Sequence, residues 1–218
     1  SYEWYEENHI TLINNDPVEK VNRQSKKIIT QKGIELEYDI CIFATGSKAF
    51  VLPIEGSNLP SVIGWRTIQD TEQIIDIASK KKKAIVIGGG LLGLECARGL
   101  LDQGMDVTVL HLAEWLMEMQ LDRKAGDMLR ADLEKQGMKF ELQANSKRII
   151  GHEDVEAVEL ADGRVIETDL VVMAVGIRPY TEVAKDAGLD VQRGIVVNDF
   201  LQTSDSNIYA IGECAEHN

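Results

Sequence analysis

Residues 84–95 constrain the fold of this chain more than any other part of its sequence. They read AIVIGGGLLGLE, in which four apolar residues typical of a buried strand run directly into the pattern GxGxxG. A helix is expected from 91 to 103, because Gly104 directly after it is a helix stop signal. A second apolar strand is expected over 107–110. A strand, a glycine loop, a helix and a strand in this order predict a βαβ unit that binds a dinucleotide.

Each glycine of this loop meets a separate physical demand. Gly88 permits the tight turn, Gly90 lets the backbone approach a pyrophosphate without a Cβ in the way, and Gly93 lets the helix pack closely on the strand. The pyrophosphate is expected on the free N–H groups at the start of the helix. Leu91 and Leu92, its first residues, therefore belong to the predicted site.

The end of the second strand departs from the usual dinucleotide fingerprint. That fingerprint places an acidic residue there, which accepts hydrogen bonds from the adenosine ribose. This chain has His111 instead, and Glu114, one turn beyond, is the candidate replacement. These residues leave the cofactor preference open. Because no arginine follows the strand, we expect NADH to bind at least as well as NADPH.

Charge and cysteine content exclude several classes of function. Lys and Arg number 23 against 36 Asp and Glu, a net charge of −13, so neither nucleic acid nor a membrane is an expected partner. The cysteines, Cys41, Cys96 and Cys214, show no metal-binding spacing, and the four histidines show no paired spacing, so no metal site is expected. A reduced, cytoplasmic protein is consistent with this pattern. The oligomeric state, a homodimer included, stays open.

Strands and helices alternate along most of the chain, which predicts an α/β fold of the Rossmann type. Further strands are expected near 10–13, 27–30 and 39–44. Further helices are expected through 68–78 and 122–136.

The sequence pattern of residues 39–46, DICIFATG, is repeated in residues 169–176, DLVVMAVG, with Asp, Ala and Gly at the same positions. A turn glycine stands six residues before each Asp, at Gly33 and Gly163. Each copy is therefore interpreted as a hairpin followed by a buried strand that ends in glycine. The shared spacing favours two copies of a larger unit.

The two copies differ in the glycine loop. In the second copy this loop begins at Gly88, 75 residues before Gly163, whereas the same offset from Gly33 falls before Ser1. The first copy therefore lacks its own loop in these 218 residues. Since the chain also begins with Ser rather than Met, we expect a trimmed piece of a longer protein.

Three segments together resemble the flavoproteins of the pyridine nucleotide-disulphide oxidoreductase superfamily. Residues 44–46 resemble the strand end of their first FAD segment, and 88–95 resemble their NAD(P)H fingerprint. Residues 208–213 resemble their second FAD motif, whose acid, usually Asp, bonds the flavin ribityl chain. The resemblance implies cofactor contacts at Ala44, Thr45, Gly46, Gly176, Gly212 and Glu213, with Glu95 near the nicotinamide.

Longer matches resemble a narrower family, the large subunits of assimilatory NAD(P)H nitrite reductases. They span 88–95, 104–112, 115–118, 120–122, 171–179 and 212–217. His111 belongs to that pattern, whereas Met119 stands where Arg is expected. In that family FAD accepts hydride from NAD(P)H and passes electrons through iron–sulfur centres to sirohaem, where nitrite becomes ammonia. The iron–sulfur and sirohaem parts are not in this sequence, so the remaining domains of the parent protein are its expected partners.

These observations predict one dinucleotide-binding unit inserted in the remnant of another. Residues 1–65 form a partial FAD-binding domain, 66–181 the NAD(P)H-binding domain, and 182–218 the return segment of the FAD domain. Hydride transfer from nicotinamide to flavin needs close positioning and no side-chain acid or base, so no catalytic residue is predicted. The fragment alone is expected to be inactive.

Two alternatives stay open. One is another flavin reductase of the superfamily, which serves rubredoxin, ferredoxin or a disulfide. The other is a non-enzymatic NAD(P)H-binding module that senses redox state.

Overall fold

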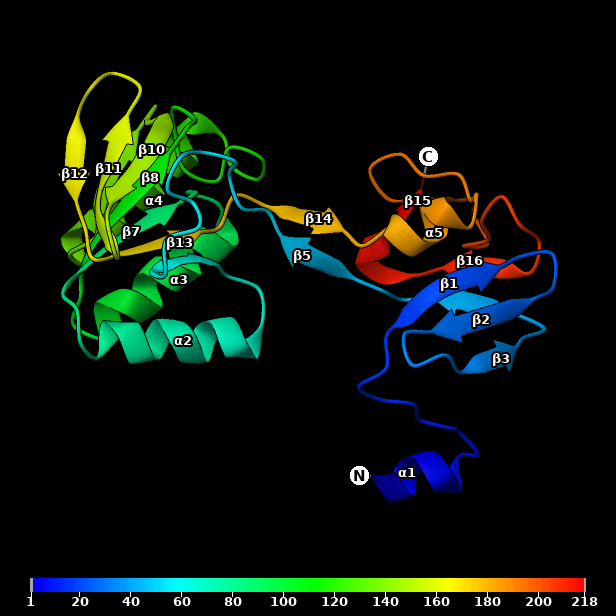
Figure 1. The fold of residues 1–218 in the computed structure, drawn as a ribbon. Helices are drawn as coiled ribbons and strands as arrows, with labels where there is room; N and C mark the ends of the chain where they lie inside the picture. The colour runs from blue at the N-terminus through cyan, green and yellow to red at the C-terminus, as the bar shows by residue number, and fades with distance from the viewer. Residues whose placement is uncertain (1, 218) are drawn as a thin grey trace. The chain divides into compact units, whose positions relative to one another are not determined.

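The computed structural model describes residues 2–217, which form two compact units (Figure 1). Unit 1 is built from both ends of the chain, up to Lys48 and from Arg178 onward, and unit 2 is the continuous segment Ala49–Ile177. The chain therefore leaves unit 1 once and returns to it once. The unit boundaries fall at 48/49 and 177/178, whereas the sequence places the domain boundaries at 65/66 and 181/182.

The centre of unit 2 is a five-stranded sheet in which every neighbouring pair is parallel. Its strands, in spatial order, are β6 (Val62–Gly64), β13 (Leu170–Met173), β7 (Lys83–Ile87), β8 (Asp106–His111) and β9 (Lys139–Leu142). Three helices accompany it: α2 (Ile68–Ala78), α3 (Leu91–Asp102) and α4 (Arg123–Lys135). The α/β class and the βαβ unit of β7, α3 and β8 are thus confirmed.

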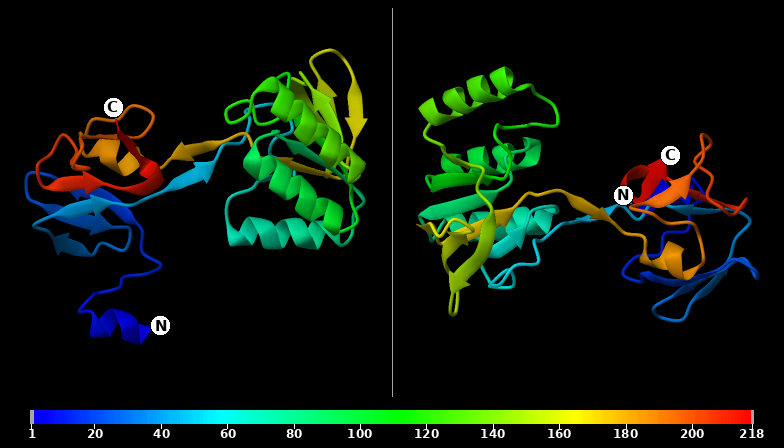
Figure 2. Two further views of the ribbon diagram at one scale, coloured as in Figure 1. Left: turned by 180° about the vertical axis from the view of Figure 1, so that it is seen from behind. Right: turned by 90° about the horizontal axis from the view of Figure 1, so that it is seen from above.

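Unit 2 has three layers: the helices, the parallel sheet and an antiparallel sheet. Successive strand residues point to opposite faces, so the parallel sheet contributes to a core on each side. On one face, Val86 of β7 packs in the same core as Ile74 of α2. The buried residues of α3 in that core are Leu94, Cys96, Ala97 and Leu100, of which Ala97 is fully buried. The left view of Figure 2 looks onto the three helices, drawn in cyan to green.

The opposite face of the parallel sheet is covered by strands rather than helices. Ile85 and Ile87 of β7 share a core there with residues of a three-stranded antiparallel sheet. Its strands are β10 (Ser146–Gly151), β11 (Val155–Leu160) and β12 (Val165–Glu167). The parallel sheet is therefore buried on both sides.

Unit 1 has a smaller core and shorter elements. A three-stranded antiparallel sheet contains β1 (Val18–Asn22), β2 (Lys27–Thr30) and β3 (Glu35–Glu37). Two further strand pairs are parallel. β4 (Cys41–Phe43) pairs with β16 (Ile208–Ala210), which lies far along the chain, and β15 (Ile195–Val197) pairs with the nearby β17 (Ala215–His217). The helical segments are α1 (Tyr2–Glu7), α5 (Glu182–Asp186) and η1 (Gly212–Cys214).

The strand expected near residues 10–13 is wrong. These residues have no regular structure, and Ile10, Leu12 and Ile13 are exposed. Alternating apolar residues form a stable strand only beside another strand, and no strand pairs with this segment in the described chain.

The repeated hairpin is confirmed. Gly33 donates its N–H to Thr30 O over 2.9 Å, and Gly163 donates its N–H to Leu160 O over 3.0 Å. Both glycines have positive φ, 82° and 90°. In each copy three antiparallel strands precede the strand that ends in glycine, β4 in unit 1 and β13 in unit 2.

The next strand of each copy lies where the chain crosses between the units. These strands are β5 (Ser47–Ala49) and β14 (Ile177–Pro179), which pair with each other. Within unit 2, Phe50 donates its N–H to Gly176 O over 2.9 Å. The chain therefore enters and leaves unit 2 at one place.

Candidate functional site

Two glycines of the loop after β7 are required by the local backbone. Gly88 has a φ of +120°, and a Cβ there would lie 2.3 Å from Ala174 O. A Cβ on Gly93 would lie 1.9 Å from Gly88 O. The tight turn at Gly88 and the close approach of α3 to the strand at Gly93 match the roles expected from the sequence.

Gly90 is different, because the space around it is open. A Cβ at this position would have no heavy atom within 4 Å, and its φ of −85° is accessible to any residue. Glycine is therefore not needed here for the fold. The open space above Gly90 is where a pyrophosphate would approach the backbone.

The N-terminus of α3 lacks a side-chain cap. Thr67 and Asp70 form a capping box on α2, and the Asp122 side chain caps α4, whereas Gly90 supplies no such hydrogen bond to α3. Among the described helices longer than ten residues, α3 alone leaves its first N–H groups without a side-chain acceptor. This positive helix end can accept an anion.

A cavity of about 560 Å³ opens at this helix end, at the carboxyl ends of β7, β8 and β13. Ligands of open α/β sheets commonly bind at this edge. Of the predicted site residues, the cavity is lined by Gly88, Gly90, Leu91, His111 and Gly176. Among the described residues, no lysine or arginine lines it.

The remaining predicted residues of unit 2 lie outside this lining. Gly93 is buried under the loop, and Leu92 and Glu95 are exposed on α3. Glu114 is exposed as well, and its carboxylate pairs with Arg123 Nη1 over 3.0 Å.

His111 is 7% exposed, and both of its ring nitrogens are engaged within the protein. Nδ1 accepts the N–H of Gly89 over 3.0 Å. Nε2 lies 3.0 Å from Trp115 O and 2.9 Å from Glu118 Oε2. Because Nδ1 is an acceptor, the neutral ring carries its proton on Nε2 and donates it to these oxygens. His111 therefore holds the glycine loop.

In unit 1 the two predicted FAD segments lie at one edge. Parallel pairing places Phe43 of β4 beside Ala210 of β16, so residues 44–46 and 211–213 follow the two strands on the same side. Ile211 donates its N–H to Phe43 O over 2.9 Å. The structure thus brings together Ala44, Thr45, Gly46, Gly212 and Glu213.

Side-chain hydrogen bonds fix this edge. Thr45 Oγ1 donates to Tyr180 O over 2.8 Å, and Ser47 Oγ donates to Glu213 Oε2 over 2.9 Å. Ser47 is not among the residues predicted from the sequence, yet it is buried and orients the Glu213 carboxylate. Its position directly after Gly46, the glycine that ends the strand pattern, is the sequence signal that could have identified Ser47.

Unit 1 does not repeat the cradle found at α3. Its described helical segments, α1, α5 and η1, contain six, five and three residues, and none follows a GxGxxG loop. In the described part of unit 1, Thr45, Gly46 and Glu213 are the groups that could contact the edge of a flavin cofactor. The same residues offer no helix N-terminus comparable to that of α3 for the pyrophosphate of that cofactor.

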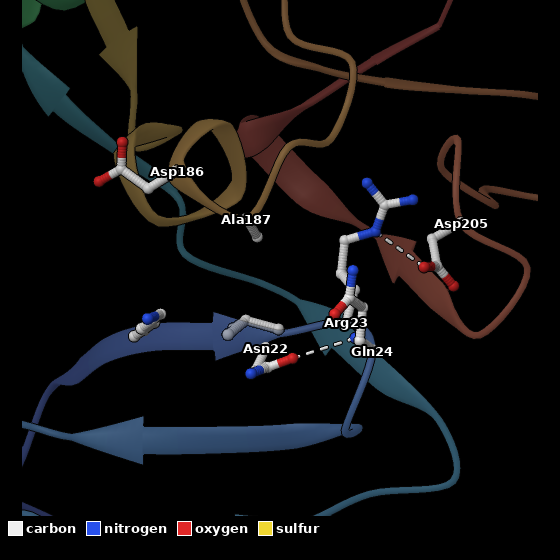
Figure 3. A pocket seen from close by; sticks show the side chains of 8 residues that line it. Asn22, Arg23, Gln24, Asp186, Ala187 and Asp205 are labelled. Carbon is white, nitrogen blue, oxygen red and sulfur yellow. Dashed lines mark hydrogen bonds and ion pairs between the residues drawn. The ribbon is translucent and has the colours of Figure 1, made fainter.

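Unit 1 has a pocket between the turn after β1 and the C-terminal part of the unit (Figure 3). Three of its polar side chains, those of Asn22, Arg23 and Asp205, form hydrogen bonds within the protein. Arg23 Nε lies 2.8 Å from Asp205 Oδ2, and Arg23 Nη1 donates to Gly188 O over 2.6 Å. Asn22 Oδ1 accepts the N–H of Gln24 over 3.1 Å. The Asn22 bond closes the turn between β1 and β2, and the two Arg23 bonds fasten that turn to the C-terminal part of the unit.

The cysteines, the possible metal ligands and the helix lengths each bear on an expectation from the sequence. Cys41, Cys96 and Cys214 are buried and free, and burial raises the pKa of the Cys96 thiol to about 12. Within residues 2–217, no three His, Cys, Asp or Glu side chains are grouped to hold a metal. None of the helices described has the length and apolar character needed to cross a membrane.

Comparison with known proteins places these sites in context. Residues 3–218 match the family described as pyridine nucleotide-disulphide oxidoreductase. The nitrite reductase [NAD(P)H] of Bacillus subtilis (strain 168) is 52% identical over 216 residues, which are 99% of this chain and 27% of that protein. The assimilatory nitrate reductase electron transfer subunit of the same organism is 44% identical, over 100% of this chain and 28% of that protein.

A solved structure agrees with the sequence relatives. The ferredoxin reductase from Rhodopseudomonas palustris superposes with a TM-score of 0.95 at 31% identity, covering 100% of this chain and 54% of that one. The chain spans less than a third of the two Bacillus relatives and about half of this reductase.

Proposed function

The chain belongs to the pyridine nucleotide-disulphide oxidoreductase family, and from this premise we propose that it is the NAD(P)H-binding, flavin-reducing portion of an NAD(P)H nitrite reductase. The 52% identity to the Bacillus nitrite reductase supports this choice within the family. In the whole protein, electrons from NAD(P)H would pass through FAD and iron–sulfur centres to sirohaem and reduce nitrite to ammonia. The remaining domains of that protein are the proposed partners.

The observation that carries the proposal is the cavity at the uncapped N-terminus of α3. The N–H groups of Gly90, Leu91 and Leu92 would hold the pyrophosphate, with Gly88 and Gly93 shaping the loop beneath it. Gly176 also lines the cavity. The cavity and the uncapped helix end support a binding site here, and the family membership supports a dinucleotide as its ligand.

Unit 2 is accordingly proposed as the NAD(P)H-binding unit, and unit 1 as the remainder of an FAD-binding unit. When bound, the nicotinamide supplies a hydride to the flavin. The chain's own residues bind and orient the dinucleotide, and Glu95 is proposed near its nicotinamide end. No side chain is assigned an acid or base role, since the transfer depends on positioning.

The compartment belongs to the same proposal. Three free, buried cysteines suit a reduced cytoplasm, where thiols persist.

A second candidate is an electron-transfer flavin reductase that serves a ferredoxin. The TM-score of 0.95 at 31% identity with the Rhodopseudomonas ferredoxin reductase supports it. Assays of the full-length protein with nitrite and with ferredoxin as acceptors distinguish the two. Both candidates use the same dinucleotide site.

The test of that site is Gly90→Val. The new side chain would fill the open space over the loop, so calorimetric titration should show no NADH binding, while circular dichroism shows an unchanged fold. Gly99→Ala is the matched control, because Gly99 is also in open space but lies two turns along α3. Unchanged NADH affinity in folded Gly90→Val would refute the site.

A further inference from the structure

The loop from 112 to 121, between β8 and α4, is fixed against the glycine loop. Met117 donates its N–H to Gly89 O over 3.0 Å, and Gly89 donates its own N–H to His111 Nδ1. Leu116 is fully buried, and a Cβ on Gly89 would lie 2.8 Å from its Cδ2 atom. The loop and the glycine loop therefore form one packed assembly within unit 2.

The other side of the loop is held by α4. A Cβ on Gly126 would lie 2.6 Å from Trp115 Cδ1, which shows how closely the helix approaches. Trp115 Nε1 donates to Leu121 O over 3.0 Å. Trp115 and Leu116 thus fix the path of the loop beside the cavity.

Glu118 is the only acidic residue that lines the cavity in the described chain. Its Oε2 atom accepts the Nε2–H of His111 over 2.9 Å, and its side chain is 35% exposed. The carboxylate is therefore oriented by a buried ring and still accessible from the cavity.

Glu114 does not have this arrangement. Its carboxylate pairs with Arg123, and it lies outside the cavity lining. His111 also cannot replace the missing acid, because Gly89, Trp115 and Glu118 occupy its two nitrogens.

We infer that Glu118 accepts hydrogen bonds from the adenosine ribose of the dinucleotide and selects NADH against NADPH. This inference rests on the proposed function of the same cavity. The 2′-hydroxyl of NADH can donate to a carboxylate, whereas the 2′-phosphate of NADPH is an anion that the carboxylate repels. No lysine or arginine in the described cavity lining offsets that repulsion.

The test compares dissociation constants of NADH and NADPH, measured by calorimetry at one salt concentration. Wild-type protein should prefer NADH. Glu118→Ala should weaken NADH binding about tenfold, the size of one charge-assisted hydrogen bond, without weakening NADPH binding. Glu118→Gln keeps an oxygen that accepts the His111 hydrogen bond but removes the negative charge. It should also reduce the preference for NADH over NADPH. Glu114→Gln, the matched control, should leave both constants unchanged.

Several outcomes separate this inference from the proposed function. An unchanged NADH-to-NADPH ratio in folded Glu118→Gln, or a change in Glu114→Gln instead, overturns the role of Glu118 and leaves the site intact. A wild-type preference for NADPH overturns it as well. Failure of wild-type protein to bind either dinucleotide overturns the proposed function, and the inference with it.

Discussion

The strands β4 and β13 carry the same sequence pattern but lie in different surroundings. All four residues of β13 are buried, because β6 and β7 flank it and both faces of its sheet are covered. In β4, Ile42 is 58% exposed, and β16 is its one strand partner in the described chain. The pattern thus specifies a strand and its terminal glycine, whereas neighbouring elements determine its burial.

The same contrast extends to ligand binding. Unit 2 follows its central strand β7 with a glycine loop and the twelve-residue helix α3. Unit 1 presents two strand ends and the Ser47–Glu213 hydrogen bond, without a comparable helix in its described residues. A pyrophosphate is held mainly by such a helix end, so the two units should differ in what they retain.

The largest expected difference is in cofactor retention. The 218-residue chain alone should purify colourless, because the edge groups of unit 1 do not replace a pyrophosphate cradle. It should still bind NAD(P)H, weakly, and show no diaphorase or nitrite reductase activity by itself. An absorption spectrum of fresh protein, with a denatured aliquot to detect released flavin, is the measurement. A stoichiometric flavin spectrum would contradict the contrast between the units.

Equivalent positions of the repeated strand provide a second comparison. Val172→Ala removes methyl groups from a fully buried site in β13 and should lower the free energy of unfolding by about 2 kcal/mol. Ile42→Ala, at the matching position of β4, should lower it by less than about 0.5 kcal/mol. Urea denaturation followed by circular dichroism measures both. Equal losses would show that burial does not distinguish the two strands.

The smallest effect concerns the ion pair that anchors the antiparallel sheet of unit 2. Lys81 Nζ donates to Asp154 Oδ2 and, over 3.1 Å, to Ser61 Oγ. Burial alone would raise the pKa of Asp154, but hydrogen bonds from Lys81 and Ser61 outweigh it and lower the pKa to about 2. Arg23 and Asp205 anchor the corresponding sheet of unit 1.

A lowered carboxyl pKa stabilises the fold above the unfolded value near 3.8, and this stability is lost as pH falls toward 2. Since the Asp154 side chain is 41% exposed, we expect a contribution of only about 1 kcal/mol. Asp154→Asn should therefore cost about this much at pH 7 and progressively less between pH 4 and pH 2. Glu153→Gln, at an exposed neighbour, is the control. A difference in unfolding free energy between wild type and Asp154→Asn that stays constant from pH 4 to pH 2 would contradict the lowered pKa of Asp154.

Local patterns predicted much of unit 2. The strand at Lys83–Ile87, the helix at Leu91–Asp102 and the strand at Asp106–His111 lie within a residue of their expected bounds. Gly88 and Gly93 also have the geometry expected of them, because a turn and a close approach depend on neighbouring residues.

The rest depends on contacts that a local pattern does not contain. Ser47 and Glu213 are 166 residues apart, and only the pairing of β4 with β16 brings them together. Glu118 reaches the cavity because the loop after β8 turns back at Met117, a residue with a φ of 54° that carries no turn signature. Residues 10–13 alternate like a strand but have no strand partner in the described chain.

Because the chain enters and leaves unit 2 at one place, unit 2 can fold during synthesis before unit 1 is complete. Every strand of the parallel sheet lies within Ala49–Ile177, so unit 2 has all its residues before β16 leaves the ribosome. Joining β4 to β16 in an unfolded chain would close a long loop, at a cost in entropy. Once unit 2 has folded, the Phe50–Gly176 hydrogen bond holds the ends of that loop together. Folded unit 2 would therefore shorten the loop that must close before unit 1 completes its core.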